Sequence, residues 1–339
     1  MSDYDLHHHG DREVGEGLID LAVNVRLPEP PEWLRRELAG ALTELAAYPD
    51  PTAAVEALAA RHRRSTAEVL VTAGAAEAFT LLATAFRDRD AVVVHPQFTE
   101  PEAALRAAGN QPRRVILEPD YALDPGLIPE DAELVFVGNP TNPTSVLNPA
   151  STLEALRKPG RIVVVDEAFL DAVPGEPESL AGKALSGVVV IRSLTKTWGI
   201  AGLRAGYLLA EAEIVRRLHA IQPPWSVSTL AARAVVACCR PAALDEADKI
   251  AVSAERDRER LVAGLRDLGL AVAGSPRAPF VLVKTPRGTR EKLREAGYAV
   301  RRGDTFPGLT DQHVRIAVRD EATTTGFLRT LARVLGRSD

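Results

Sequence analysis

The sequence predicts an α/β protein with a mostly parallel central sheet in a large domain and a second, small α+β domain. Short apolar runs rich in β-branched residues recur along the chain, at Ala91–His95, Arg113–Leu117, Leu134–Val137, Arg161–Asp166, Val188–Ile191 and Ala205–Leu209. They are continuously apolar, as strands buried on both faces are. Helical patterns lie between many of them, at Gly74–Phe86, Pro101–Ala108 and Pro149–Leu156. This alternation is typical of a parallel sheet covered by helices on both sides.

The two ends of the chain differ from its centre and predict the small domain. Pro31–Ala46 has a helical pattern with proline near its first turn. After Trp225 the pattern contains, in order, a long helical stretch to Leu268, apolar runs at Phe280–Val283 and Val314–Val318 with a helix between them, and a last helix to about Leu335. We therefore expect a large domain over residues 48–222 and a small domain built from residues 1–47 and 223–339.

The composition excludes several classes of protein. Lys and Arg (41) are scattered and outnumbered by Asp and Glu (46), so the net charge is −5 and no basic face for nucleic acid is expected. No apolar run approaches the ~20 residues of a membrane span, and the polar N-terminus lacks the apolar core of a signal peptide. The only two cysteines, Cys238 and Cys239, are neighbours, which excludes a disulfide framework. A cytoplasmic location and a small-molecule substrate fit this composition.

Two segments that follow predicted strands carry the chemistry of a cofactor site. In the first, Ser193-Leu-Thr-Lys196 precedes Arg204, and a lysine just after a buried strand can form a Schiff base with an aldehyde cofactor. A hydroxyl at Ser193 and a guanidinium at Arg204 suit phosphate oxygens. In the second, an apolar strand ends in Asp166, and a carboxylate beneath a pyridine nitrogen keeps that nitrogen protonated. Together they predict pyridoxal 5'-phosphate, although Lys196 alone would be an ordinary loop lysine.

Two further segments fit the same cofactor. Asn142 lies in Gly138-Asn-Pro-Thr-Asn142-Pro-Thr144, a rigid turn whose amide can hydrogen-bond a phenolic oxygen. Ala75 and Ala76 lie where a helix begins after Thr72, and the free N–H groups of a first helical turn bind anions. Phe98 follows a strand and could stack on a flat ring or equally fill the core.

The order of these motifs resembles that of the fold-type I PLP-dependent aminotransferase superfamily over nearly the whole chain. The matching positions are Gly74-x-x-Glu77, Phe98, Asn139-Pro-x-Asn142-Pro, Asp166-Glu-Ala, Ser193-x-x-Lys196 and Arg204. The resemblance implies that Lys196 is the Schiff-base lysine and Asp166 the partner of the pyridine nitrogen. It implies that Asn142 binds the phenolic oxygen and Phe98 stacks on the ring. The phosphate would be held by Ala75, Ala76, Ser193 and Arg204.

The resemblance also implies a partner and a substrate. Tyr48, in Tyr48-Pro-Asp, matches a tyrosine that reaches the cofactor phosphate of the other subunit, which implies a homodimer with shared active sites. A phosphorylated amino acid would be held by four residues from both ends of the chain, namely His9, Asn24, Arg301 and Arg315.

Two branches of the superfamily look closest: histidinol-phosphate aminotransferase and the threonine-phosphate decarboxylase of cobalamin biosynthesis. The decarboxylase is favoured by its match to His9-Gly10-Asp11, Asp166–Phe169, Pro224–Val227, and Arg301 followed by Phe306–Leu309 and Arg315–Arg319. We therefore expect a lyase that decarboxylates L-threonine O-3-phosphate. The alternative is an aminotransferase of the histidinol-phosphate type, since Arg315 suits either reaction. A third hypothesis is a cofactor-binding module without catalysis.

The N-terminal segment departs from the decarboxylase pattern. Asp11 replaces a glycine, and Arg26-Leu27 replaces Asn-Pro, both in a segment expected to touch the substrate phosphate. A carboxylate near a phosphate is unfavourable, and Arg26 could compensate for Asp11. The run His7-His8-His9 suggests a metal, but adjacent histidines in an extended segment point to alternate sides and no cluster completes a site, so we expect none.

Overall fold

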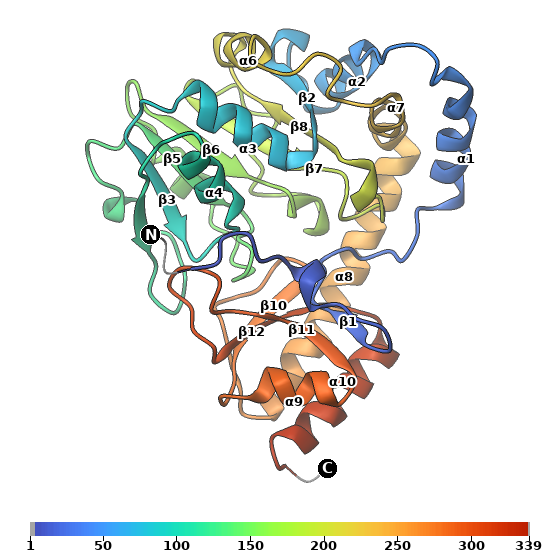
Figure 1. Cartoon of the computed structure of the whole chain (residues 1–339), viewed down its shortest axis with the longest axis vertical. Coiled ribbons are helices and arrows are strands. Elements are labelled where there is room, and N and C mark those ends of the chain that lie inside the picture. The colour runs from blue at the N-terminus through green and yellow to red at the C-terminus, as the bar shows by residue number, and fades with distance from the viewer. Residues whose placement is uncertain (1–3, 338–339) are drawn as a thin grey trace.

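Two β-sheets, each with its own helical cover, organise the chain, and Figure 1 shows them one above the other. The structure is a computed structural model that describes residues 4–337. Residues 1–3 and 338–339, the two ends of the expected small domain, lie outside the described residues. Among the described residues, no helix has both the length and the apolar character needed to span a bilayer.

The larger sheet has seven strands in the order β2-β8-β7-β6-β5-β3-β4. Their bounds are β2 Val69–Ala73, β3 Ala91–His95, β4 Arg113–Ile116, β5 Leu134–Gly138, β6 Ile162–Asp166, β7 Val188–Ser193 and β8 Ala205–Leu209. All neighbouring pairs are parallel except those of β8, which runs antiparallel to both β2 and β7. The expected mostly parallel α/β fold is confirmed.

Both faces of this sheet are buried because consecutive side chains of its apolar strands point to opposite sides. Val163 and Val165 of β6 join one core cluster, whereas Val164 between them joins the other. The first cluster includes residues of α1 (Glu32–Ala41), α2 (Thr52–His62), α5 (Ala150–Glu154) and α7 (Thr229–Cys238). The second includes residues of α3 (Gly74–Ala85), α4 (Glu100–Ala107) and α6 (Ala212–His219). The double cover explains why these strands read as continuous apolar runs.

The smaller sheet has five strands in the order β1-β11-β12-β10-β9. Their bounds are β1 Ile19–Leu21, β9 Ala271–Val272, β10 Phe280–Lys284, β11 Tyr298–Arg302 and β12 His313–Ala317. A third core cluster joins this sheet to α8 (Pro241–Asp267), α9 (Thr289–Glu295) and α10 (Glu321–Val334). The long helix α8 connects the two sheets, since Ala243 near its start packs in the core of the large sheet and Leu265 near its end packs in this one.

Several elements differ from those expected. The short strands β1, β2, β9 and β11 were not expected, and β1 spans three residues that acquire strand character by pairing with β11 nearly 280 positions later in the chain. The helical stretch after Trp225 is two helices rather than one, because α8 begins at Pro241 and proline has no N–H for a continuing helix. These features depend on distant partners or on one residue, which periodicity does not reveal.

Replacing Gly206 with alanine tests how tightly β8 packs against the start of α3. A Cβ at Gly206 would lie 2.8 Å from Gly74 Cα and 2.9 Å from Ala75 N, both backbone atoms that are part of the core. We expect Gly206→Ala to lower the free energy of unfolding by about 1–3 kcal/mol, measured by thermal and urea unfolding. Gly202→Ala is the matched control, because nothing lies within 4 Å of a Cβ there. Equal stability of the two variants would contradict this packing.

Candidate active site

The polar residues singled out in the large sheet gather where its parallel strands end. Asp166 ends β6, Asn142 and Lys196 follow β5 and β7, Phe98 follows β3, and Ala75 lies in the first turn of α3 directly after β2. Because β2, β3, β5, β6 and β7 run in one direction, these positions meet at one edge of the sheet, where open α/β folds bind ligands.

Two adjoining cavities lie at this edge. An inner cavity of about 110 Å³ is lined by Ala75, Ala76, Phe98, Asn142, Asp166, Ala168, Phe169, Ser193, Thr195, Lys196 and Arg204. An outer cavity of about 480 Å³ is lined by residues of the N-terminal segment and the small sheet, including His9, Asn24, Arg301 and Arg315. Five residues line both cavities, namely Phe98, Asn142, Phe169, Lys196 and Arg204. Every residue expected in the site lines one cavity or the other, except Tyr48.

One end of the inner cavity is suited to an anion. The N–H groups in the first turn of α3, a helix of 12 residues, have no carbonyl partner within the helix and carry the positive end of its dipole. Gly74 has φ +76°, and a Cβ there would lie 2.5 Å from Arg204 Nη2, so only glycine lets the guanidinium lie across the helix start. Ser193 Oγ is buried nearby, 2.8 Å from Thr195 Oγ1. A phosphate group fits these donors.

Burial changes the acid–base properties of Lys196 and Asp166 in opposite senses. Loss of solvent, reinforced by the charges of Arg204 and Arg315, lowers the pKa of Lys196 to about 8. Loss of solvent raises the pKa of Asp166 to about 6, although the N–H of Ala168 and the charge of Lys196 oppose the rise. A lysine with this pKa has a large neutral fraction near physiological pH, which nucleophilic attack on an aldehyde requires.

The outer cavity contains buried polar atoms that lack partners. Arg315 Nη1 donates to Asn142 Oδ1 at 2.6 Å and its Nη2 donates to the carbonyl of Ala22. Its Nε, together with Asn24 Oδ1, is buried without a hydrogen-bond partner among the described residues. Burial, followed by the charge of Arg301, lowers the pKa of the Arg315 guanidinium. Unpaired buried groups of this kind mark a place where a ligand completes the hydrogen bonding.

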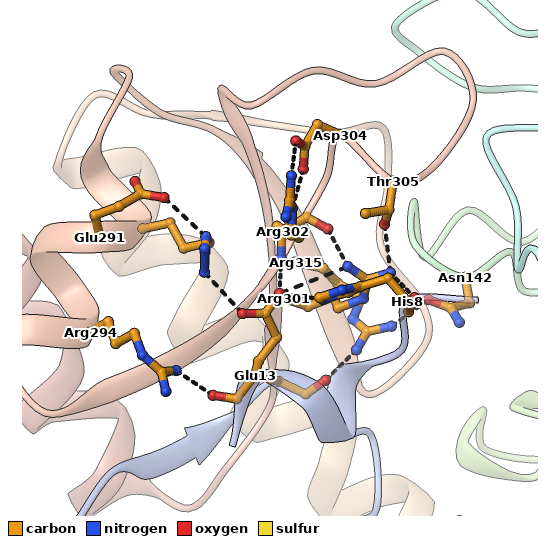
Figure 2. A network of polar contacts seen from close by, with 12 residues as sticks. His8, Glu13, Asn142, Glu291, Arg294, Arg301, Arg302, Asp304, Thr305 and Arg315 are labelled. Atoms are coloured by element: carbon orange, nitrogen blue, oxygen red, sulfur yellow. Dashed lines mark hydrogen bonds and ion pairs between the residues drawn. The ribbon is translucent and has the colours of Figure 1, made fainter. Parts of the chain in front are cut away.

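Residues 4–13, which we call the arm, form a wall of the outer cavity. His9 Nε2 lies 2.5 Å from Glu100 Oε1 of α4, and the His9 and Phe98 rings lie 5.5 Å apart. Asp11 also lines this cavity, and its charge partly opposes the lowering of the Lys196 pKa. Arg301 is 2% exposed and donates to the His8 carbonyl and to Thr305 Oγ1, both at 2.6 Å, as Figure 2 shows. The arm and the small sheet therefore share Arg301.

Two supporting contacts had no recognisable signal in the sequence. Asp171 Oδ2 accepts a hydrogen bond from Thr197 Oγ1 at 2.7 Å, next to Lys196 along the chain. Glu167, next to Asp166, forms a fully buried ion pair with Arg192 at 3.0 Å. These pairs connect the end of β6 with the end of β7. Glu167 lies in the Asp166-Glu-Ala motif, but only the structure shows that it forms an ion pair with Arg192.

Two residues singled out in the sequence have side chains that line neither cavity. The Arg26 side chain pairs with Asp257 at 2.7 Å and lines neither cavity, so the expectation that it compensates for Asp11 is wrong. Only its backbone touches the site, where Arg26 N donates to the carbonyl of Lys196 at 3.2 Å.

Tyr48 is 76% exposed and stacks on Trp225 with ring centroids 4.3 Å apart. Within one chain, Tyr48 has no part in the cavities.

A family model described as aminotransferase class I and II matches residues 16–331. The chain belongs to this family. A histidinol-phosphate aminotransferase of Mycobacterium bovis is 51% identical over 319 residues, covering 93% of this chain and 87% of that protein. The threonine-phosphate decarboxylase of Salmonella typhimurium is 30% identical, covering 94% of this chain and 91% of that protein. The crystal structure of the histidinol-phosphate aminotransferase from Clostridium acetobutylicum shares the fold, with a TM-score of 0.85, 24% identity, and coverage of 93% of this chain and 98% of that one.

Membership of this family means that the protein is an enzyme and that pyridoxal 5'-phosphate is its cofactor. The inner cavity fits that group. It combines a phosphate site at α3, a carboxylate at Asp166 and a lysine at Lys196 in one buried space. When bound, the cofactor supplies an electron-withdrawing ring that stabilises negative charge at the substrate Cα.

The expectation of a threonine-phosphate decarboxylase, and hence of a lyase, was wrong. The relative that is 51% identical is named a histidinol-phosphate aminotransferase, whereas the decarboxylase is 30% identical. One of the motifs that favoured the decarboxylase lies outside the cavities. Trp225, in the matched Pro224–Val227, is 59% exposed and lines neither cavity, so it has no contact with a substrate in its own chain. Phe169 packs edge-on against Phe280 with ring centroids 4.9 Å apart and also lines both cavities.

The pKa of Lys196 predicts how the cofactor-free enzyme takes up pyridoxal 5'-phosphate. Only the neutral amine attacks the aldehyde, so the uptake rate should rise with pH and level off above about pH 8. Stopped-flow absorbance measures this rate, and Lys196→Ala, which should show no covalent uptake, is the control. A rate that climbs steadily to about pH 10, as for a solvated lysine, would contradict the assigned environment.

Proposed function

We propose that the protein is an aminotransferase that transfers the amino group of L-histidinol phosphate to a 2-oxo acid such as 2-oxoglutarate. The proposal is supported by 51% identity, over 93% of the chain, to a protein named histidinol-phosphate aminotransferase. The geometry that carries it is the pair Arg301 and Arg315 in the wall of the outer cavity, beside the inner cavity of Lys196. The planar guanidinium group can form two parallel hydrogen bonds with either a phosphate or a carboxylate. The same cavity can therefore accept a phosphorylated amine and, in the second half of the reaction, a dicarboxylate.

Lys196 is proposed to carry the proton that distinguishes amino transfer from other reactions. With its pKa lowered to about 8, Lys196 could act as a base toward the substrate Cα proton near neutral pH, and the cofactor, when bound, would stabilise the negative charge left at that carbon. Asp166 keeps its charge for the ring nitrogen, because a cation placed against a buried carboxylate offsets the cost of burial. Arg315 holds the substrate anion next to Asn142, to which it donates a hydrogen bond.

Residues at the other end of the inner cavity are proposed to hold the cofactor in place. Ala75, Ala76, Ser193 and Arg204 bind its phosphate, and Phe98 packs against its ring. His9 and Asn24 complete the substrate contacts from the N-terminal side. Asn24 Oδ1 has no hydrogen-bond donor among the described residues and could accept one from the substrate. These roles follow from the family resemblance, and the cavity linings are compatible with each of them.

We also propose that a second copy of the chain covers the Tyr48–Trp225 pair. These stacked rings are 76% and 59% exposed, and Leu42 and Leu45, close in sequence to Tyr48, are about half exposed. Large exposed apolar side chains gathered in this way are typical of interaction surfaces. A homodimer would bury them and would place Tyr48 at the cofactor phosphate of the partner, where a phenol can donate a hydrogen bond.

A product assay tests the reaction. With L-histidinol phosphate and 2-oxoglutarate, the holoenzyme should form glutamate in equal amount to the consumed amine and release no CO2, followed by mass spectrometry. L-Histidinol, which lacks the phosphate, should react at least about a hundredfold less efficiently, because two buried arginines lose their anion. Release of CO2 from L-threonine O-3-phosphate, with no glutamate formed, would contradict the proposal.

The oligomeric state tests the proposed interface. Trp225→Glu should shift the protein from dimer to monomer in light scattering and weaken cofactor retention, since a buried unpaired charge opposes association. Leu127→Glu is the matched control, because Leu127 is also about half exposed but lies far along the chain, in the short 3-10 helix Pro125–Leu127 before β5. A monomeric wild-type protein, or an unchanged dimer in Trp225→Glu, would count against this interface.

A further inference from the structure

Glu13, the last residue of the arm, is buried although it carries a charge. It ends the short 3-10 helix Gly10–Glu13 and is 3% exposed, whereas Asp11 and Arg12 beside it are exposed. Burying a carboxylate is costly unless it is paired and hydrogen-bonded. Figure 2 shows Glu13 at the centre of a network that reaches from the arm into the small sheet and α9.

The contacts of Glu13 come from three separate parts of the chain. Within the arm, its Oε1 lies 2.9 Å from His8 Nε2. In the small sheet, the same oxygen accepts from Arg302 N at 3.4 Å and lies 3.9 Å from Arg301 Nη1. On α9, Arg290 Nη1 donates to its Oε2 at 3.0 Å, and Arg294 Nη1 donates to its backbone carbonyl. One carboxylate therefore connects the arm to β11 and to α9.

Arg301 depends on the arm for part of its surroundings. Of the five N–H groups of a guanidinium, three of those of Arg301 donate hydrogen bonds among the described residues, to the Arg302 carbonyl, the His8 carbonyl and Thr305 Oγ1. The His8 carbonyl belongs to the arm, and Glu13 is the nearest negative charge. Burial lowers the pKa of Arg301 to about 10, and the charge of Glu13 opposes that change.

We propose that Glu13 is a positioning residue, which holds the arm and Arg301 against each other so that Arg301 binds the anionic group of the substrate. The inference rests on the proposed function only in taking the substrate to be anionic. Glu13 does not line either cavity and touches no substrate itself. It acts through Arg301, and through the arm that places His9 and Asp11 in the cavity wall.

Glu13 could act on Arg301 through its charge or by holding the arm in position, and its removal would then change anion binding in opposite directions. The inference is therefore testable. If Glu13 acted only through its charge, removing it would leave Arg301 more attractive to an anion, so anion binding would become tighter. If Glu13 acts by position, its removal frees the arm and Arg301, so anion binding becomes weaker. Glu13→Gln removes the charge and replaces one of the two acceptor oxygens with an NH2 group, which cannot accept a hydrogen bond from Arg290 or from Arg302 N, so it also loosens the arm. Glu13→Asp keeps the charge but is one methylene too short to reach both His8 and Arg290.

The experiment titrates the holoenzyme, whose cofactor site is filled, with inorganic phosphate by isothermal titration calorimetry. We expect both Glu13→Gln and Glu13→Asp to weaken phosphate binding by roughly tenfold or more, with the absorbance of the bound cofactor unchanged. Hydrogen exchange of residues 4–18 should become faster in both. Turnover should show a raised KM for the amino substrate and a nearly unchanged kcat. Glu16→Gln, at an exposed position three residues later, is the matched control and should resemble the wild type.

The outcomes separate this inference from the proposed function. Weaker phosphate binding in both Glu13 variants supports it even if L-histidinol phosphate proves not to be a substrate. Tighter binding in Glu13→Gln with normal binding in Glu13→Asp would show that charge alone operates and would overturn it. A lower unfolding temperature with unchanged phosphate affinity would show that Glu13 only stabilises the fold, and it would overturn the inference. Absence of phosphate binding in the wild-type enzyme would also overturn it.

Discussion

The parallel direction of five strands is the constraint on which the whole site depends. Because β2, β3, β5, β6 and β7 all end at one edge of the large sheet, side chains from positions 75 to 196 converge there. The strands are held in register by apolar side chains buried on both faces. The rigid core thus fixes where Asp166 and Lys196 can lie, and the chemistry uses the loops that follow.

Burial at that edge sets the electrostatics of the site. Lys196 and Asp166 share a space with little solvent, and the pKa of each is displaced toward its neutral form. Arg315 keeps an unpaired Nε, and Asn24 an unpaired Oδ1, at the same place. Each of these features is costly without a ligand: an anion would pair with Arg315, a hydrogen-bond donor would satisfy Asn24 Oδ1, and a positive ring nitrogen would pair with Asp166. The cavity is therefore prepared for a cofactor and an anionic substrate together.

The choice between branches of the family shows the limit of short motifs. Pro224–Val227 matched the decarboxylase pattern, yet none of its residues lines either cavity, whereas Phe169, which also matched, lines both. A motif can be shared because it packs the fold or faces another subunit, and such a motif carries no information about which substrate bond breaks. Sequence identity over the whole chain also counts the residues of the cavity walls. It therefore favours the aminotransferase branch, which the short motifs did not.

The sequence alone determined the α/β fold, most strands of the large sheet and the cofactor, because apolar runs and the residues directly after them are local features. Lys196, Asp166 and Asn142 could be recognised since each lies at the end of its own strand or shortly after it. Only the tertiary structure revealed the short strands β1 and β11, the ion pair of Arg26 with Asp257, and the network around Glu13. Glu13 and Arg290 are 277 residues apart, and their pairing depends on a folded arm. Contacts of that kind arise from where distant segments meet, which no local pattern of residues encodes.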